Sequence, residues 1–181
     1  IEGTSMEGYL FPETYTYTSS TTPELLLRAM VDQLDDQLTP ELLESAKALG
    51  LNRHQLITLA SIIQKEAGNV MEMPLISAVF HNRLKRGIAL QADPTVIYGV
   101  ANFDGNLTRK HLETPTPYNT YRMRGLPIGP IASPGQFALH AAANPAESKD
   151  LYFVARGDGT HEFNATLKAH NRAVRRYQLK R

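Results

Sequence analysis

Apolar residues recur with a helical period along much of this chain, and one such stretch includes an acidic residue. Between positions 53 and 67 the apolar side chains fall on one broad face of a helix: Leu56, Leu59, Ala60, Ile62 and Ile63. Glu66 follows three and four positions after the last two, so the pattern places its carboxyl group on that apolar face. The opposite face is predicted to carry the polar residues Thr58, Ser61 and Lys65.

Two features of this position predict a raised pKa for Glu66. Burial among apolar side chains disfavours the ionised form of a carboxyl group. Gly68 is expected to end the helix in a left-handed conformation, which leaves Glu66 in the last turn, where the helix dipole also disfavours an anion. A carboxyl group with a raised pKa suits general acid catalysis near neutral pH. The pattern is equally compatible with a glutamate at the helix edge whose carboxylate bends into solvent.

The remaining pattern predicts an α+β fold that is rich in helices. Asn52 and Gln55 are expected to form a capping box at the start of the Glu66 helix. Further helices are expected to begin at Pro23, at Pro40 (ending at Gly50), at Pro74 (ending before Gly87), after a capping Ser133 (through Ala143) and at about Ala165 (to Leu179). A single helical turn is expected at 108–112.

Short strands and one long loop complete the prediction. The aromatic and β-branched segment 9–17 is expected to form extended strands interrupted at Pro12, and 151–156 and 160–163 a β-hairpin around a Gly-Asp-Gly turn. Segment 91–98 is expected to be a turn that leads into an apolar stretch. The proline-rich segment 114–135 is predicted to be an ordered binding loop. A substrate cleft is expected beside the Glu66 helix.

Composition limits the classes of chemistry that remain. The chain has 181 residues, enough for the single domain 1–181, and its net charge of +1 without a basic block predicts no nucleic-acid partner. Without cysteine there are no disulfides or cysteine–zinc sites, and His161 and His170 lack the spacing of a metal site, so neither metal nor cofactor is expected. No apolar stretch is long enough to cross a bilayer. The chain begins at Ile1, so we expect an excerpt whose anchor lies upstream.

A second carboxyl group is the usual partner of an acid that cleaves a glycosidic bond. Asp93, Glu7 and Glu13 stand in conspicuous contexts and are candidates for that partner of Glu66. Asp93 is equally well explained as a turn residue whose side chain bonds to the backbone two residues on. Glu7 is also compatible with a solvated position, so the sequence leaves the partner open.

Several stretches that together span nearly the whole chain match one known family in order: 7–15, 60–66, 79–84, 90–99, 116–121, 125–131 and 151–154. On these stretches the chain resembles the MltG (YceG-like) family of endolytic murein transglycosylases. The resemblance implies enzymes that cut nascent peptidoglycan strands internally between N-acetylmuramic acid and N-acetylglucosamine, leave a 1,6-anhydro end and so limit strand length. Ala92 and Ile128 depart from the family pattern, which puts a polar substrate contact at position 92 in doubt.

The resemblance also implies particular residues and surroundings. It places the essential glutamate on Glu66, and we expect the sugars to be held by Gln91, Asp93, Tyr118, Asn119, Thr120, Tyr121 and Glu7. The family acts at the periplasmic face of the bacterial inner membrane, held there by an N-terminal helix. That anchor and a LysM-like portion are expected upstream, and the present fragment is expected to be soluble. The implied partners are peptidoglycan glycan strands and peptidoglycan synthases.

Three alternative functions remain open from the sequence. A lysozyme-type hydrolase would use Glu66 with Asp93 or Glu7. A non-catalytic glycan-binding module of the wall-synthesis machinery would bind strands without shortening them. A pyridoxal-phosphate lyase would need a lysine in a buried pocket, whereas Lys65 and Lys85 occupy polar or terminal positions.

Overall fold

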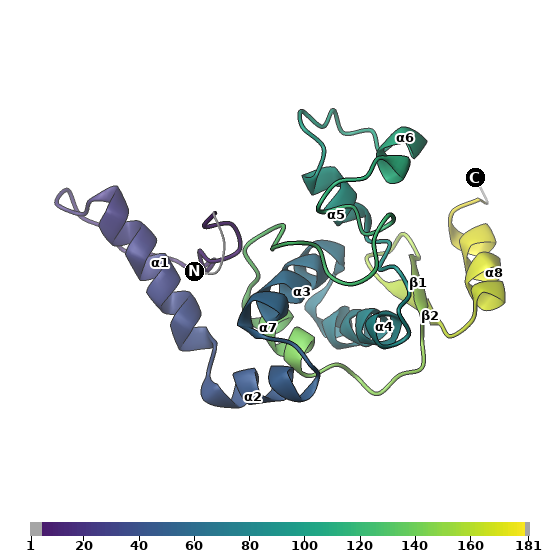
Figure 1. Cartoon of the computed structure of the whole chain (residues 1–181), viewed down its shortest axis with the longest axis horizontal. Helices are drawn as coiled ribbons and strands as arrows, with labels where there is room; N and C mark the ends of the chain where they lie inside the picture. Colours follow the sequence, from purple (N-terminus) through teal and green to yellow (C-terminus); the bar gives the residue numbers. More distant parts are fainter. Residues whose placement is uncertain (1–4, 180–181) are drawn as a thin grey trace.

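Helix α3 (Arg53–Glu66) lies at the centre of the molecule in the computed structural model, which describes residues 5–179 (Figure 1). It packs against four helices: α2 (Pro40–Ala48), α4 (Met73–Lys85), α5 (Asp93–Tyr98) and α7 (Gln136–Ala143). The outer elements are α1 (Pro23–Gln37), the short 3-10 helix η1 (Val70–Glu72), α6 (Arg109–Glu113), β1 (Tyr152–Ala155), β2 (His161–Asn164) and α8 (Leu167–Tyr177). The predicted helix-rich α+β class is confirmed.

Helix α3 is buried on every side, not on one face. All eight residues from Leu56 to Ile63 are buried, including Thr58 and Ser61, so the predicted polar face is wrong at these two positions. Both hydroxyls are satisfied locally: Thr58 donates to the His54 carbonyl at 2.8 Å and Ser61 to the Thr58 carbonyl at 2.7 Å. Local bonds of this kind make a buried hydroxyl tolerable, and the periodicity of one helix does not reveal them.

The predicted helix starts are mostly confirmed by their caps. Thr22 and Thr39 accept hydrogen bonds from the backbone of the first turns of α1 and α2, and Asn52 and Gln55 form the expected capping box. Ser133 is not the cap of α7. The N-cap is Gly135, and no side chain caps the first turn; the N–H of Gly135 itself donates to Gln64 Oε1 of α3 at 3.0 Å.

The end of α3 differs from the prediction. Gly68 does not adopt a left-handed conformation, because Ala67 already turns the chain into an extended path at φ −74° and ψ 122°. Gly68 is required for space instead: a Cβ atom there would lie 2.6 Å from the carbonyl oxygen of Gly159. The turn of the β-hairpin therefore lies directly against the residues that follow Glu66.

The segment 9–17 forms no strand, which corrects the prediction for it. Its aromatic side chains are used for packing: Tyr9 and Phe11 are buried, and the Phe11 N–H donates to the Met30 carbonyl of α1 at 3.1 Å. The segment has high strand propensity but no neighbouring strand, and strand pairing depends on such a neighbour. The predicted hairpin is confirmed, with β1 antiparallel to β2 and Ala155 opposite His161.

Segments 91–98 and 114–135 pack against each other. The expected turn at 91–98 is a short helix, α5, in which Asp93 is the first residue. The long loop is ordered, as predicted, largely through Asn119, whose side-chain amide donates to the carbonyls of His111, Leu112 and Thr114 at 2.7–3.2 Å. Its Oδ1 accepts from the Tyr121 N–H at 2.9 Å.

No helix within residues 5–179 is long and apolar enough to cross a membrane.

Replacing Asn119 with aspartate is expected to lower the free energy of unfolding by at least about 2 kcal/mol, because a carboxylate oxygen would face three carbonyl oxygens that now accept bonds. Urea unfolding followed by circular dichroism measures the change. Asn106→Asp, in an exposed loop, is the matched control and should change it by less than about 0.5 kcal/mol. Equal stability of the two variants would show that Asn119 does not hold the loop.

Candidate active site

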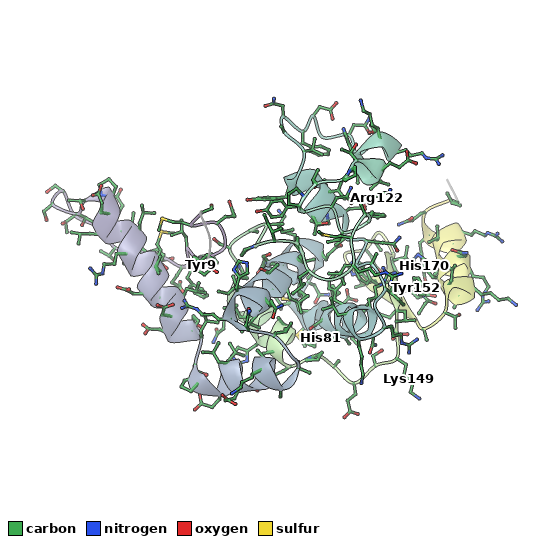
Figure 2. All side chains as sticks on the ribbon, in the orientation of Figure 1. Tyr9, His81, Arg122, Lys149, Tyr152 and His170 are labelled. Atoms are coloured by element: carbon green, nitrogen blue, oxygen red, sulfur yellow. The ribbon has the colours of Figure 1, made fainter. Side chains whose placement is uncertain are left out.

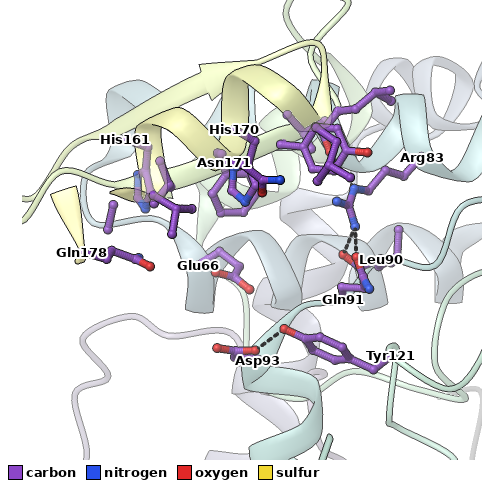
Figure 3. A pocket seen from close by; sticks show the side chains of 18 residues that line it. Glu66, Arg83, Leu90, Gln91, Asp93, Tyr121, His161, His170, Asn171 and Gln178 are labelled. Carbon is purple, nitrogen blue, oxygen red and sulfur yellow. Dashed lines mark hydrogen bonds between the residues drawn. The ribbon is translucent and has the colours of Figure 1, made fainter. Parts of the chain in front are cut away.

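A cavity of about 490 Å³ opens at the C-terminal end of α3 (Figure 3). Glu66 lies at this end of the helix and Asp93 at the start of α5, and α4 contributes Arg83. The hairpin and α8 form another wall, with His161 from β2 and His170 from α8 among the lining residues. Because the central helix ends here, its last carboxyl group lies at the boundary between core and cavity.

Glu66 has the electrostatic character of a general acid. Its side chain is half-buried, and no described residue donates a hydrogen bond to the carboxyl group or forms an ion pair with it. Burial, followed by the nearby negative charge of Asp93, raises the pKa of Glu66 to about 8. The raised pKa expected from the sequence is therefore found, although its second cause is a neighbouring carboxylate and not the helix end. At neutral pH the carboxyl group is mostly protonated.

Asp93 is held beside Glu66 by Tyr121. The Tyr121 hydroxyl donates to Asp93 Oδ1 at 2.5 Å, so the aspartate bonds across the cavity and not to its own backbone (Figure 3). Burial, and then this bond to Asp93, raise the pKa of Tyr121 further above its already high ordinary value. Tyr121 therefore remains a hydrogen-bond donor at any physiological pH, and Asp93 is positioned as an acceptor.

Arg83 supports the opposite end of the cavity and was not singled out from the sequence. Its Nε donates to the Leu151 carbonyl at 2.7 Å, and its Nη1 donates to the carbonyls of Ala89 and Leu90 and to Gln91 Oε1 at 2.9–3.1 Å. The buried guanidinium thereby joins α4 to the hairpin and to Gln91. The sequence did contain an indication that Arg83 is buried, because it lies three and four positions after Phe80 and Val79 on the apolar face of α4.

The aromatic ring of Tyr152 covers the guanidinium of Arg83. Its central carbon lies 5.0 Å from the centre of the Tyr152 ring, and the His170 ring stacks on the same tyrosine at 5.2 Å (Figure 2). The charge of Arg83, after the larger effect of burial, lowers the pKa of His170. Spacing in the sequence gave no indication of this stack, because its members come from α4, β1 and α8.

The cavity brings together four of the sequence-predicted residues, namely Glu66, Gln91, Asp93 and Tyr121. Asn119 and Thr120 are fully buried and bond within the protein, so they support Tyr121 and Gln91 and do not line the cavity. The remaining candidates, Tyr118 and Glu7, lie outside it. Tyr118 packs edge-on against Tyr98 at 4.6 Å, and Glu7 is exposed, with its charge among the causes that raise the pKa of Tyr98. Their contact with a sugar stays a prediction.

Among residues 5–179 the cavity offers neither a metal-binding cluster nor an imine-forming lysine. No group of three histidine, aspartate or glutamate side chains in this part of the chain is placed to hold a metal ion. The described residues that line the cavity include no lysine. The polar groups of this lining are carboxyl, hydroxyl, amide, imidazole and guanidinium groups.

The chain is similar over nearly its whole length to known bacterial proteins. The family model described as the YceG-like family matches residues 2–176. A Bacillus subtilis (strain 168) protein named endolytic murein transglycosylase is 39% identical over 173 residues, which is 95% of this chain and 48% of the relative. A Streptococcus pneumoniae (strain D39) protein of the same name is 36% identical over 155 residues, 83% of this chain and 28% of the relative.

A solved structure agrees with these relatives. The crystal structure of a yceG-like protein from Listeria monocytogenes matches 93% of this chain and 55% of that chain, with a TM-score of 0.84 and 37% sequence identity. The chain thus spans about half the length of the Bacillus relative and of the Listeria structure. The extent of the family match and the level of identity together give the conclusion that this chain belongs to the YceG-like family.

Proposed function

We propose that this chain is the catalytic part of an endolytic murein transglycosylase and that Glu66 is its catalytic acid. The observation that carries the proposal is the half-buried Glu66 at the cavity, with its pKa raised to about 8 beside Asp93. The names of the Bacillus and Streptococcus relatives supply the substrate class, murein glycan strands.

One carboxyl group is sufficient for this reaction. Protonated Glu66 donates its proton to the oxygen that links C1 of N-acetylmuramic acid to the next sugar, and the C1–O bond breaks. The resulting carboxylate then takes the proton of the muramyl 6-hydroxyl, whose oxygen bonds to C1 and closes the 1,6-anhydro ring. Glu66 ends protonated and no water is consumed, so a second carboxyl group is not needed to activate water.

Asp93 has an electrostatic role in this proposal. Positive charge develops near C1 as the glycosidic bond breaks, and a fixed carboxylate on the same cavity stabilises it. The bond from Tyr121 holds the carboxylate of Asp93 in place, and the charge of Asp93 adds to the larger effect of burial in keeping Glu66 protonated. Gln91, exposed at the cavity and bonded to Arg83, is proposed as a sugar contact together with Tyr121.

The same pair of carboxyl groups keeps the hydrolase as the second candidate. If water entered the cavity beside Asp93, it would attack C1 and leave a reducing sugar. The identity of the product therefore separates the two reactions. We further propose that the protein works at the periplasmic face of the bacterial inner membrane, on strands made by peptidoglycan synthases; this part of the proposal rests on the family resemblance of the sequence alone.

Wild-type protein is expected to shorten purified glycan strands and to leave 1,6-anhydro ends, whereas Glu66→Gln should lower the rate at least about a hundredfold, because an amide cannot give up and recover a proton. Mass spectrometry of the products measures both. Glu147→Gln, at an exposed position, is the matched control and should keep wild-type activity. Products with reducing ends would favour the hydrolase. Binding of strands without shortening them would favour a non-catalytic module. Cleavage by the Glu66→Gln variant would exclude Glu66 as the acid.

The pH dependence of kcat/KM is expected to show an alkaline limb near pH 8, because catalysis requires protonated Glu66 and this form is lost as the pH rises through its pKa. Asp93→Asn removes a negative charge that raises this pKa, so the limb should move to lower pH. Tyr121→Phe keeps the carboxylate of Asp93, and its limb should not move down. An unshifted limb in Asp93→Asn would show that the charge of Asp93 does not act on Glu66.

A further inference from the structure

His161, which lines the cavity, forms a nearly buried pair with Glu72 that the reaction proposed above does not use. Only 15% of the Glu72 side chain and 10% of the His161 side chain are exposed. His161 Nδ1 lies 2.8 Å from Glu72 Oε2, and the backbone N–H of His161 donates to Glu72 Oε1 at 3.0 Å. Both carboxylate oxygens of Glu72 thus form hydrogen bonds with His161.

This pairing fixes the proton arrangement of the imidazole ring. An ionised carboxylate only accepts hydrogen bonds, so Nδ1 carries the hydrogen and donates it to Glu72. In the neutral ring Nε2 is then an acceptor. No residue within 5–179 bonds to Nε2, whereas the ring as a whole lines the cavity that contains Glu66. A hydrogen-bond acceptor of defined orientation is therefore available to a ligand.

The ring is also held in place sterically. Phe153 packs edge-on against it, with ring centres 5.4 Å apart, and Phe163 lies 6.3 Å away. The backbone of the hairpin is tied to the residues after α3 through the close approach of Gly159 to Gly68, and Glu72 ends η1 a few residues later. In Figure 3 Glu66 lies between His161 on the hairpin and Asp93 on α5.

We propose that His161 is a substrate-positioning residue whose Nε2 accepts a hydrogen bond from a sugar hydroxyl beside the scissile bond. This inference rests on the proposed transglycosylase function and adds a specific contact to it. Murein sugars present hydroxyl groups, which are the donors that such a nitrogen recognises. Orienting a reacting sugar relative to Glu66 acts on the rate of the chemical step more than on binding.

His170, the other histidine of the cavity, is not arranged in this way. Among the described residues its Nδ1 is buried without a hydrogen-bond partner, and its ring stacks on Tyr152. No carboxylate in this part of the chain sets its tautomer. The pairing with Glu72 therefore distinguishes His161 from a histidine that only fills space.

A purely structural role for the pair is the competing explanation, and His161→Asn separates the two. The asparagine amide nitrogen can replace Nδ1 as donor to Glu72, but it leaves nothing at the position of Nε2. We expect a melting temperature within about 2 °C of wild type and kcat on glycan strands lowered by about tenfold to a hundredfold with little change in KM. His161→Gln, whose longer amide reaches toward the Nε2 position, should recover part of the activity.

The same measurements of melting temperature and kcat supply a control variant and the outcomes that would contradict the inference. His140→Asn, at an exposed position on α7, should leave both melting temperature and kcat unchanged. A folded His161→Asn variant with wild-type kcat would overturn the inference while the proposed function stands. Wild-type protein that cleaves no strands would overturn the proposed function and this inference with it.

If His161→Asn does not fold, Glu72→Gln decides the question. An amide at position 72 either accepts from or donates to Nδ1, so one bond to the hairpin is kept but the tautomer is no longer fixed. The inference predicts a severalfold loss of kcat in this variant at unchanged melting temperature. Unchanged kcat would mean that the orientation of the imidazole proton is irrelevant and would overturn it.

Discussion

The burial of α3 on all sides is the constraint on which the rest of the structure depends. Its eight central residues have almost no exposed surface, so each polar atom among them needs a partner inside the protein. Ser61 meets this need and extends it, since its Oγ also accepts from the Ile131 N–H of the long loop at 3.0 Å. The helix thereby fixes the loop 114–135. Its last turn lies where the core ends, and this places Glu66 at the cavity.

The site lowers the stability of the fold in a defined pH range. The pKa of Glu66 is about 8 in the folded protein and about 4.5 as an ordinary glutamate, so the folded state binds this proton more tightly than the unfolded chain does. Stability from this group is complete below the lower value and is lost as the pH rises toward the higher one. At neutral pH the loss is on the order of 3 kcal/mol. Because the fold tolerates this loss of stability, Glu66 stays protonated near neutral pH and can act as an acid.

Local chemistry in the sequence was sufficient for most of the helices and their caps, for the hairpin and for the unusual environment of Glu66, but not for α5 or the start of α7. Interactions between distant residues were not accessible in the same way. Glu72 and His161 are 89 positions apart and Asp93 and Tyr121 are 28 apart, and neither pair has a local signature. Three of the wrong predictions share this cause. Ser61 bonds to a distant loop, the N–H of the α7 N-cap Gly135 donates to Gln64 of α3, and the carbonyl of Gly159 leaves no room for a side chain at Gly68.

The choice between water and a sugar hydroxyl as nucleophile follows from how the cavity orders its ligand. Asp93 beside Glu66 resembles the second carboxylate of a hydrolase, but its oxygen already accepts a short bond from Tyr121. A carboxylate engaged in this way is better suited to stabilising charge than to taking a proton from water. Intramolecular attack instead requires a sugar held in one orientation, which is the role proposed for the His161 imidazole. The supporting residues around Glu66 therefore favour the transglycosylase reaction.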